Sequence, residues 1–146
     1  MEIQLYSETH FEQCVAIFIS NIDKYFATHE LAEFKTFLEY AATSNTYYVV
    51  IDDSVVVACG GFEIFNEQMV LTWGMVQRDL QGHGYGKALT LYRLDAIKAE
   101  NDNISVKIAT SQHTKGFYEK QGFVVQSIEK NGFDQGLDKY HMVLTL

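Results

Sequence analysis

The sequence predicts a fold of the α/β (α+β) class, in which a mixed, mostly antiparallel central sheet carries helices on both faces. Three observations support this prediction. The 146 residues suit a single domain spanning 1–146, since domains are usually 100–150 residues long. Strand-like and helix-like patterns alternate in the order β-α-α-β-β-β-α-β-α-β-β. The chain has no proline, and no change of composition marks a linker.

The N-terminal part of the chain predicts a strand followed by two helices. Glu2–Tyr6 alternates between apolar and polar residues, as a short strand does. Thr9 and Glu12 have the spacing of a capping box, which predicts a helix beginning after Thr9. Apolar residues at helical spacing from about 28 to 41 predict the second helix.

Three strands are expected in the middle of the chain. Asp52-Asp53 reads as the turn between the first two strands, so we expect a hairpin there. Gly60 and Gly61 fall inside the second strand, which suggests a bulge or a close approach of two backbones. The expected strands are Tyr47–Ile51, Ser54–Phe65 and Gln68–Val76.

After the third of these strands comes a glycine-rich stretch, and then a second set of helices and strands. Asn101–Asn103 is expected to end the first helix of this set, and Gly122 is a plausible cap for the next one. The expected elements are a helix over 85–100, a strand over 104–108, a helix over 112–121, a strand over 123–129, a glycine-bearing loop over 131–138 and a strand over 139–145.

The charge of the chain argues against several classes of protein. The net charge is −8, which makes a general nucleic-acid binder a poor hypothesis, because phosphate contacts need clustered Lys and Arg. No apolar run approaches 18 residues and the N-terminus lacks the pattern of a signal peptide, so we expect a cytoplasmic protein without membrane contact. Residues 1–77 hold two basic and eleven acidic residues, whereas residues 78–146 hold nine basic and eight acidic residues. This asymmetry suits a phosphate-bearing cofactor on the second half and a cationic acceptor near the first, although simple solubilising charge explains it equally well.

The two cysteines give no sign of a disulfide framework or a catalytic thiol. Cys14 and Cys59 lie in apolar surroundings and have no motif spacing. We expect two buried free thiols in a reducing compartment, and we expect no metal site.

The stretch Gln81–Lys87 lies where a strand gives way to a helix, and it predicts an anion site. The first N–H groups of a helix have no partner within the helix, and glycines let a phosphate approach them closely. Two familiar loops do not fit. A P-loop needs Ser or Thr after Gly-Lys, where this chain has Ala88, and the dinucleotide-binding pattern places its glycines after an early strand. A tight structural turn remains the simplest alternative.

Two motifs in the second half of the chain carry a resemblance to a known family. Gln81, Gly84 and Gly86 have the Gln-x-x-Gly-x-Gly spacing, and 117–123 reads Phe-Tyr-Glu-Lys-Gln-Gly-Phe. Together they resemble the acetyl-CoA loop and the helix-ending signature of the GNAT superfamily of N-acetyltransferases. The resemblance covers the C-terminal half by motif and the whole chain by length and element order.

The resemblance implies a set of cofactor contacts and a catalytic acid. The pantetheine arm of acetyl-CoA would run along the strand 68–76, which in this family separates from its neighbour at a bulge, with Gly74 a plausible bulge position here. Tyr118 matches the tyrosine that gives a proton to the leaving thiolate. Many members carry Asn where this chain has Ser111, whose hydroxyl can still bind the arm. The implied cofactor residues are Met75, Val76, Gln81, Gly82, His83, Gly84, Tyr85, Gly86, Lys87, Ser111 and His113.

The general base is the least determined part of the site. Many members of the family place Glu or His on the strand 68–76, where this chain has apolar residues and Thr72. Glu63 is our first choice, because its strand neighbours that one. Glu67, His113 and Asp134 are alternatives, and a chain of waters could replace a single base.

The sequence therefore predicts an acetyl-CoA-dependent N-acetyltransferase that acts by direct transfer on a primary amine of a small molecule, and the acidic first half of the chain suits a cationic one. Two alternatives stay open: acetylation of a protein N-terminus or lysine, and binding of acyl-CoA without catalysis. A homodimer is possible, but no exposed stripe decides it. The acceptor pocket would be built from the two N-terminal helices, the strand 68–76 and the loop 131–138, with Tyr25, Phe26, His29, Trp73 and Phe133 as candidate lining residues.

Overall fold

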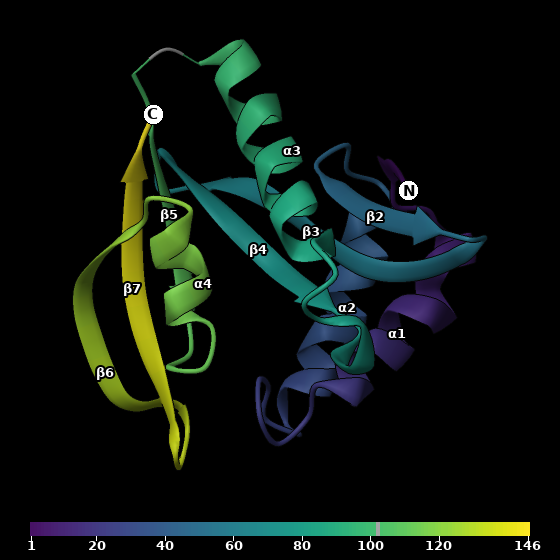
Figure 1. Cartoon of the computed structure of the whole chain (residues 1–146), viewed down its shortest axis with the longest axis horizontal. Coiled ribbons are helices and arrows are strands. Elements are labelled where there is room, and N and C mark those ends of the chain that lie inside the picture. Colours follow the sequence, from purple (N-terminus) through teal and green to yellow (C-terminus); the bar gives the residue numbers. More distant parts are fainter. Residues whose placement is uncertain (102) are drawn as a thin grey trace.

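The computed structural model describes residues 1–101 and 103–146, and these residues form one seven-stranded sheet in the order β1-β2-β3-β4-β5-β7-β6 (Figure 1). Within this part of the chain, β4 and β5 are the parallel pair and the other neighbours are antiparallel. The predicted order of strands and helices is confirmed. The strands are β1 (Glu2–Leu5), β2 (Tyr47–Asp52), β3 (Val55–Phe65), β4 (Gln68–Val76), β5 (Ser105–Thr110), β6 (Val124–Asp134) and β7 (Leu137–Thr145).

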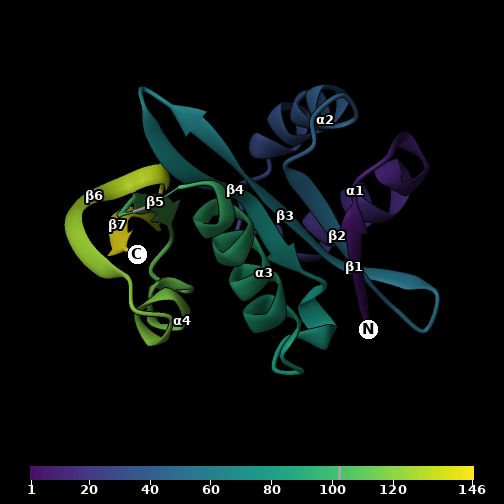
Figure 2. The ribbon, with the colours of Figure 1, turned by 90° about the horizontal axis from the view of Figure 1, so that it is seen from above.

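Helices cover both faces of the sheet, as Figure 2 shows. The four α-helices of the described residues are α1 (Phe11–Ser20), α2 (Glu30–Ala41), α3 (Tyr85–Glu100) and α4 (Lys115–Lys120). Helices α1 and α2 lie on one face, and α3 and α4 lie on the other. Asp102, at the expected end of α3, lies outside the described residues. No helix in the described chain is long and apolar enough to span a membrane.

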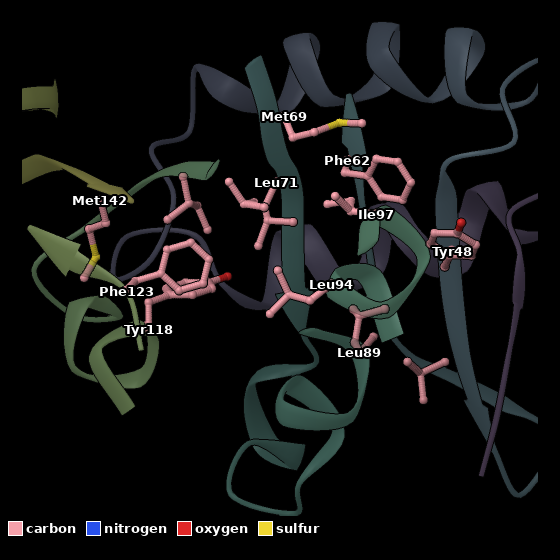
Figure 3. Close-up of a cluster of buried hydrophobic side chains, with 14 of the residues drawn as sticks. Tyr48, Phe62, Met69, Leu71, Leu89, Leu94, Ile97, Tyr118, Phe123 and Met142 are labelled. Carbon is pink, nitrogen blue, oxygen red and sulfur yellow. The ribbon is translucent and has the colours of Figure 1, made fainter. Parts of the chain in front are cut away.

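Each face of the sheet has its own apolar core. Between the sheet and α3, Phe62, Leu89 and Ile97 belong to a buried cluster that also includes Tyr118 of α4 (Figure 3). Between the sheet and the N-terminal helices, a second cluster includes the fully buried Phe34. Burying one such side chain contributes about 1.5–3 kcal/mol, so packing on both faces holds the sheet in place.

The start of α1 corrects the expected capping box. One turn of 3₁₀-helix (Glu8–His10) precedes α1, and the cap is Ser7 rather than Thr9. The Ser7 N–H donates to His10 Nδ1 at 3.0 Å, so His10 takes the place expected for Glu12. The Thr9 hydroxyl shares a 2.6 Å hydrogen bond with Ser7 Oγ instead of capping a helix.

The segment 131–138 is not the expected loop, because β6 continues to Asp134 and β7 begins at Leu137. Side chains bonded to the backbone replace part of the ladder, since Asn131 Oδ1 accepts the Gly136 N–H at 2.7 Å and Asp138 Oδ1 accepts the Asn131 N–H at 2.9 Å. Such polar residues are typical of turns, which is why the sequence pattern favours a loop here.

The Gln112 side chain braces this hairpin from the segment before α4. Its Nε2 donates to the Gly136 carbonyl at 2.8 Å, and its Oε1 accepts the Asp138 N–H at 2.8 Å. Helix α4 accordingly begins at Lys115, three residues later than expected. The two hydrogen bonds hold the tip of the hairpin in a fixed position.

The sheet is interrupted at two places on β4. Cys59 pairs with Met75 and Gly61 with Thr72, so β4 has one more residue than β3 between these pairs, and the expected bulge at Gly74 is confirmed. Strands β4 and β5 pair only at Met69–Val106 and Val70–Lys107 within the described chain. Beyond these pairs the two strands separate and leave an opening in the sheet.

Candidate active site

A cavity of about 780 Å³ lies at this opening and is lined from both faces of the sheet. Most of the residues that the sequence predicts for the cofactor meet there. Among the predicted cofactor residues His83 is the exception, and the predicted base Glu63 is also not among the lining residues. The predicted residues that line the cavity are Met75, Val76, Gln81, Gly82, Gly84, Tyr85, Gly86, Lys87, Ser111, His113 and Tyr118.

The glycine-rich loop has the geometry of an anion site. Gly84 caps α3 in the left-handed conformation (φ +85°), which glycine adopts without strain. A Cβ on Gly86 would lie 3.4 Å from Val76 Cγ2 and 3.5 Å from the Phe117 ring, so this position of α3 faces β4 and α4 at ordinary contact distance. The exposed Lys87 adds positive charge at the N-terminal end of the helix.

Gln81 of the motif is hydrogen-bonded to Asn21, which the sequence analysis did not single out. The Gln81 Nε2 donates to Asn21 Oδ1 at 3.1 Å, and Asn21 Nδ2 donates to the Val76 carbonyl at 2.9 Å. The Asn21 side chain is 1% exposed and also bonds the Ile17 carbonyl at 2.9 Å. Asn21 therefore joins the end of α1, the end of β4 and the glycine loop.

His83 and Tyr85 stack on each other at the glycine loop. The His83 ring stacks on Tyr85 with 6.1 Å between centroids, and its Nδ1 lies 2.9 Å from the Leu80 carbonyl oxygen. The Tyr85 hydroxyl donates to the Asp52 carboxylate, which raises the pKa of Tyr85 and lowers that of Asp52. These contacts fix the loop against β2.

Tyr118 is held by aromatic packing at the opening between β4 and β5. It is 7% exposed, and its ring meets Phe117 and Phe123 edge-on at 5.0 and 5.6 Å. Figure 3 shows its hydroxyl directed toward Leu71 of β4. Ser111, which is also buried and lines the cavity, accepts the His113 N–H at 3.2 Å. The Tyr118 ring is thus held in one position in the lining of the cavity.

The other end of the cavity is aromatic. Tyr25, Phe26, His29, Trp73 and Phe133, which the sequence predicts for the acceptor pocket, all line it. The Trp73 ring packs 5.3 Å from that of Phe34, and Tyr25 meets the edge of His113 at 6.1 Å.

Carboxylates stand among these aromatic rings, and sequence reasoning missed the most buried of them. Glu30 and Glu33 of α2 line the cavity, and Glu30 is 7% exposed with its Oε2 accepting the Ala27 N–H at 2.8 Å. Burial raises the pKa of Glu30. Asp134 Oδ2 lies 4.0 Å from His29 Nδ1. An acid in the first turn of a helix is common because the helix dipole favours it there, so nothing in the sequence distinguishes Glu30 as a site residue.

Glu63, the predicted base, lies elsewhere on the sheet. It is half-buried on β3 opposite Val70, and burial raises its pKa. Because Glu63 is not among the residues that line the cavity, the structure does not bring it together with Tyr118.

A model of the GNAT acetyltransferase domain matches residues 8–146. The chain belongs to the GNAT acetyltransferase family. It is therefore an acyltransferase, and the expected family is confirmed. The curated proteins contain no match to this GNAT chain.

Solved structures confirm the GNAT fold. A ribosomal-protein-alanine N-acetyltransferase from Brucella melitensis is 16% identical with a TM-score of 0.81, covering 100% of both chains. An aminoglycoside 6'-N-acetyltransferase from Enterococcus faecium is 13% identical with a TM-score of 0.75, covering 99% of this chain and 97% of that one. Another aminoglycoside 6'-N-acetyltransferase, in complex with coenzyme A, is 14% identical with a TM-score of 0.77 and the same coverage. Because the named acceptors differ, these likenesses define the fold of this GNAT chain and leave its acceptor open.

Proposed function

We propose that this chain transfers the acetyl group of acetyl-CoA directly to a primary amine of a small cationic molecule. The observation that carries the proposal is one continuous cavity with two chemically different ends. The glycine loop and Lys87 form an end suited to phosphates, whereas Glu30 and Glu33 stand among aromatic rings at the other end. Tyr118 lies at the opening in the sheet between them.

The cofactor end offers a donor or acceptor to each part of acetyl-CoA. The pyrophosphate would lie on the first N–H groups of α3 beside Lys87, because these groups have no partner within the helix. The pantetheine arm would follow β4 beyond Val70, where β5 has turned away and backbone groups are open to an added strand. The Val76 carbonyl already accepts a hydrogen bond from Asn21, so Met75 and the Val76 N–H are the groups we assign to the arm.

The chemistry needs a neutral amine and a protonated leaving group. Acetyl-CoA supplies a thioester whose carbonyl carbon is attacked by the amine lone pair, so that a C–N bond forms and the C–S bond breaks. The electron pair of the C–S bond leaves with sulfur, and the Tyr118 hydroxyl gives sulfur its proton. The proton released by the amine nitrogen returns to Tyr118 through solvent, so the products are the acetamide and coenzyme A thiol.

The acidic end of the cavity would recognise and deprotonate the acceptor. An ammonium group between Glu30 and Glu33 is attracted by both carboxylates, and aromatic faces also favour cations. Because burial raises the pKa of Glu30, this carboxylate is a better proton acceptor than an ordinary glutamate. We therefore assign the base to Glu30, and the earlier assignment to Glu63 has no support from its position outside the cavity lining.

Calorimetry with acetyl-CoA tests the cofactor site. Gly84→Glu places a carboxylate where we place the pyrophosphate, and Gly84→Gln is the matched control with the same bulk and the same backbone strain but no charge. We expect micromolar binding by the natural protein, a moderate loss in Gly84→Gln and a much larger loss in Gly84→Glu. Absence of binding by the natural protein would refute the proposal.

A panel of acceptors then tests the substrate class. Thiol release is followed with polyamines, aminoglycosides and short peptides, and the product mass confirms acetylation. We expect turnover with the cationic small molecules, and Glu33→Gln should raise the KM for the amine and leave the affinity for acetyl-CoA unchanged. Turnover with peptides alone would favour a protein acetyltransferase, and binding without any turnover would favour an acyl-CoA sensor.

A further inference from the structure

A buried arginine lies against the bulge on β4, and the transfer reaction as described gives it no role. Arg93 of α3 is 1% exposed, and no carboxylate of the described residues lies within ion-pair distance of its guanidinium. Its Nε has no hydrogen-bond partner. Burying a cation without a neighbouring anion costs folding free energy, so a role other than stability is expected for Arg93.

The guanidinium packs directly on the glycines of the bulge. A Cβ on Gly74 would lie 3.0 and 3.1 Å from the Arg93 Nη1 and Nη2 atoms, and one on Gly60 would lie 3.2 Å from Nη1. Nη1 donates to the Gly61 carbonyl at 3.2 Å, while Nη2 donates to Thr90 Oγ1 at 3.3 Å. Arg93 therefore holds one carbonyl of the interrupted ladder and leaves positive charge beside it.

Tyr47 holds the bulge from the opposite face of the sheet. Its hydroxyl donates to the Trp73 carbonyl at 2.8 Å, and Trp73 itself has a positive φ of 44°. Tyr47 belongs to the cluster beneath α1 and α2, whereas Arg93 comes from α3 on the other face. In a trans peptide the N–H points opposite to the carbonyl, so fixing the Trp73 carbonyl also fixes the Gly74 N–H.

We propose that Arg93 and Tyr47 are positioning residues that clamp the β4 bulge from its two faces, so that its peptide groups and the guanidinium charge stabilise the oxyanion of acetyl transfer. The inference rests on the proposed function, because the oxyanion forms when the amine attacks the thioester carbonyl. Preorganised donors act where charge develops, and their largest effect is on turnover rather than on substrate binding.

Four variants test the clamp kinetically. Arg93→Met keeps the bulk and removes the charge, and Arg93→Lys restores a charge without the planar group. We expect kcat to fall about 30-fold or more in Arg93→Met with the KM for acetyl-CoA within threefold, and Arg93→Lys to recover part of the loss. Tyr47→Phe should lower kcat about fivefold. The control is Tyr6→Phe, which should leave kcat unchanged although the buried Tyr6 ring lies 5.8 Å from that of Tyr47, centroid to centroid. A folded Arg93→Met with kcat within twofold of the natural protein would overturn the proposal.

A readout that does not depend on turnover separates this inference from the proposed function. The infrared carbonyl stretch of bound ¹³C-labelled acetyl-CoA should shift to lower wavenumber in the natural protein and shift less in Arg93→Met and Tyr47→Phe. Tyr47→Phe keeps the core shape, so it carries the test if Arg93→Met fails to fold. Failure of acetyl-CoA to bind would refute the proposed function, whereas binding with the same carbonyl stretch in all variants would refute the clamp alone.

Discussion

Replacing Tyr118 by Phe removes one oxygen from a ring whose position is set by its neighbours. Phe117 and Phe123 contact the ring edge-on, and the hydroxyl faces the cavity. Phe has the same ring, so the aromatic packing stays intact and we expect the free energy of unfolding to change by less than about 1 kcal/mol. The variant thus tests the role of the hydroxyl as a proton donor without disturbing the fold.

The expected loss of rate follows from what the hydroxyl supplies. A positioned general acid contributes about 10²–10⁴-fold, and the lower end applies here because water that enters the cavity can also protonate the thiolate. A hundredfold loss corresponds to about 2.7 kcal/mol of activation free energy. The KM for acetyl-CoA should change little, because the ring that contacts the arm is still present.

The assay is steady-state release of coenzyme A thiol with one cationic amine, together with urea unfolding. Tyr48→Phe is the matched control, since Tyr48 is also 7% exposed in the same cluster but does not line the cavity. We expect kcat to fall about a hundredfold in Tyr118→Phe and to stay unchanged in Tyr48→Phe. If Tyr118→Phe turns over within twofold of the natural protein, the acid role is wrong.

Three further predictions concern the bulge, the acidic end and the hairpin. Gly60→Ala places a Cβ 3.0 Å from the Gly74 Cα, so urea unfolding should show a loss of about 1–3 kcal/mol, whereas Gly116→Ala, whose Cβ meets nothing within 4 Å, should show none. Burial raises the pKa of Glu30 above its ordinary 4.5, so the folded chain holds this proton more tightly and stability falls as pH rises from 4.5 through the raised pKa. Glu30→Gln should flatten that part of the stability curve and lower kcat. Gln112→Ala frees the hairpin tip, so kinetics should show a higher KM for the amine, and calorimetry an unchanged Kd for acetyl-CoA.

The glycine loop was predictable because its signal is local. A strand that leads into a helix through Gly84 and Gly86 defines the proposed anion site within a few residues, and the order of elements follows from periodicity. The aromatic residues proposed for the acceptor pocket were also predictable as cavity lining from the expected fold, because the loop before α2 and the β6–β7 hairpin approach the same opening. Phe133 and Trp73 meet at the cavity although 60 positions separate them in the sequence.

The residues that the sequence did not indicate act on parts of the chain far from their own position. Asn21 bonds the Val76 carbonyl 55 positions away, and Arg93 bonds the Gly61 carbonyl 32 positions away. Helical periodicity does not distinguish Arg93 from a surface arginine. The pattern shows which positions are apolar, but it does not show which group a charged side chain bonds. A single sequence predicts such long-range contacts only for residues that belong to a recognised motif, and neither Asn21 nor Arg93 belongs to one.

These distant donors share one property, which is that each satisfies a carbonyl at the β3–β4 bulge or at the end of β4. Tyr47 bonds the Trp73 carbonyl, Arg93 bonds that of Gly61 and Asn21 bonds that of Val76. A buried carbonyl without a partner costs about 1–3 kcal/mol, and a continuous sheet would have satisfied all three without buried polar side chains. Folding stability alone gives no reason to interrupt β4 and then supply three donors from outside it. The interruption is explained if open backbone groups at this point bind acetyl-CoA and the donors keep their direction fixed.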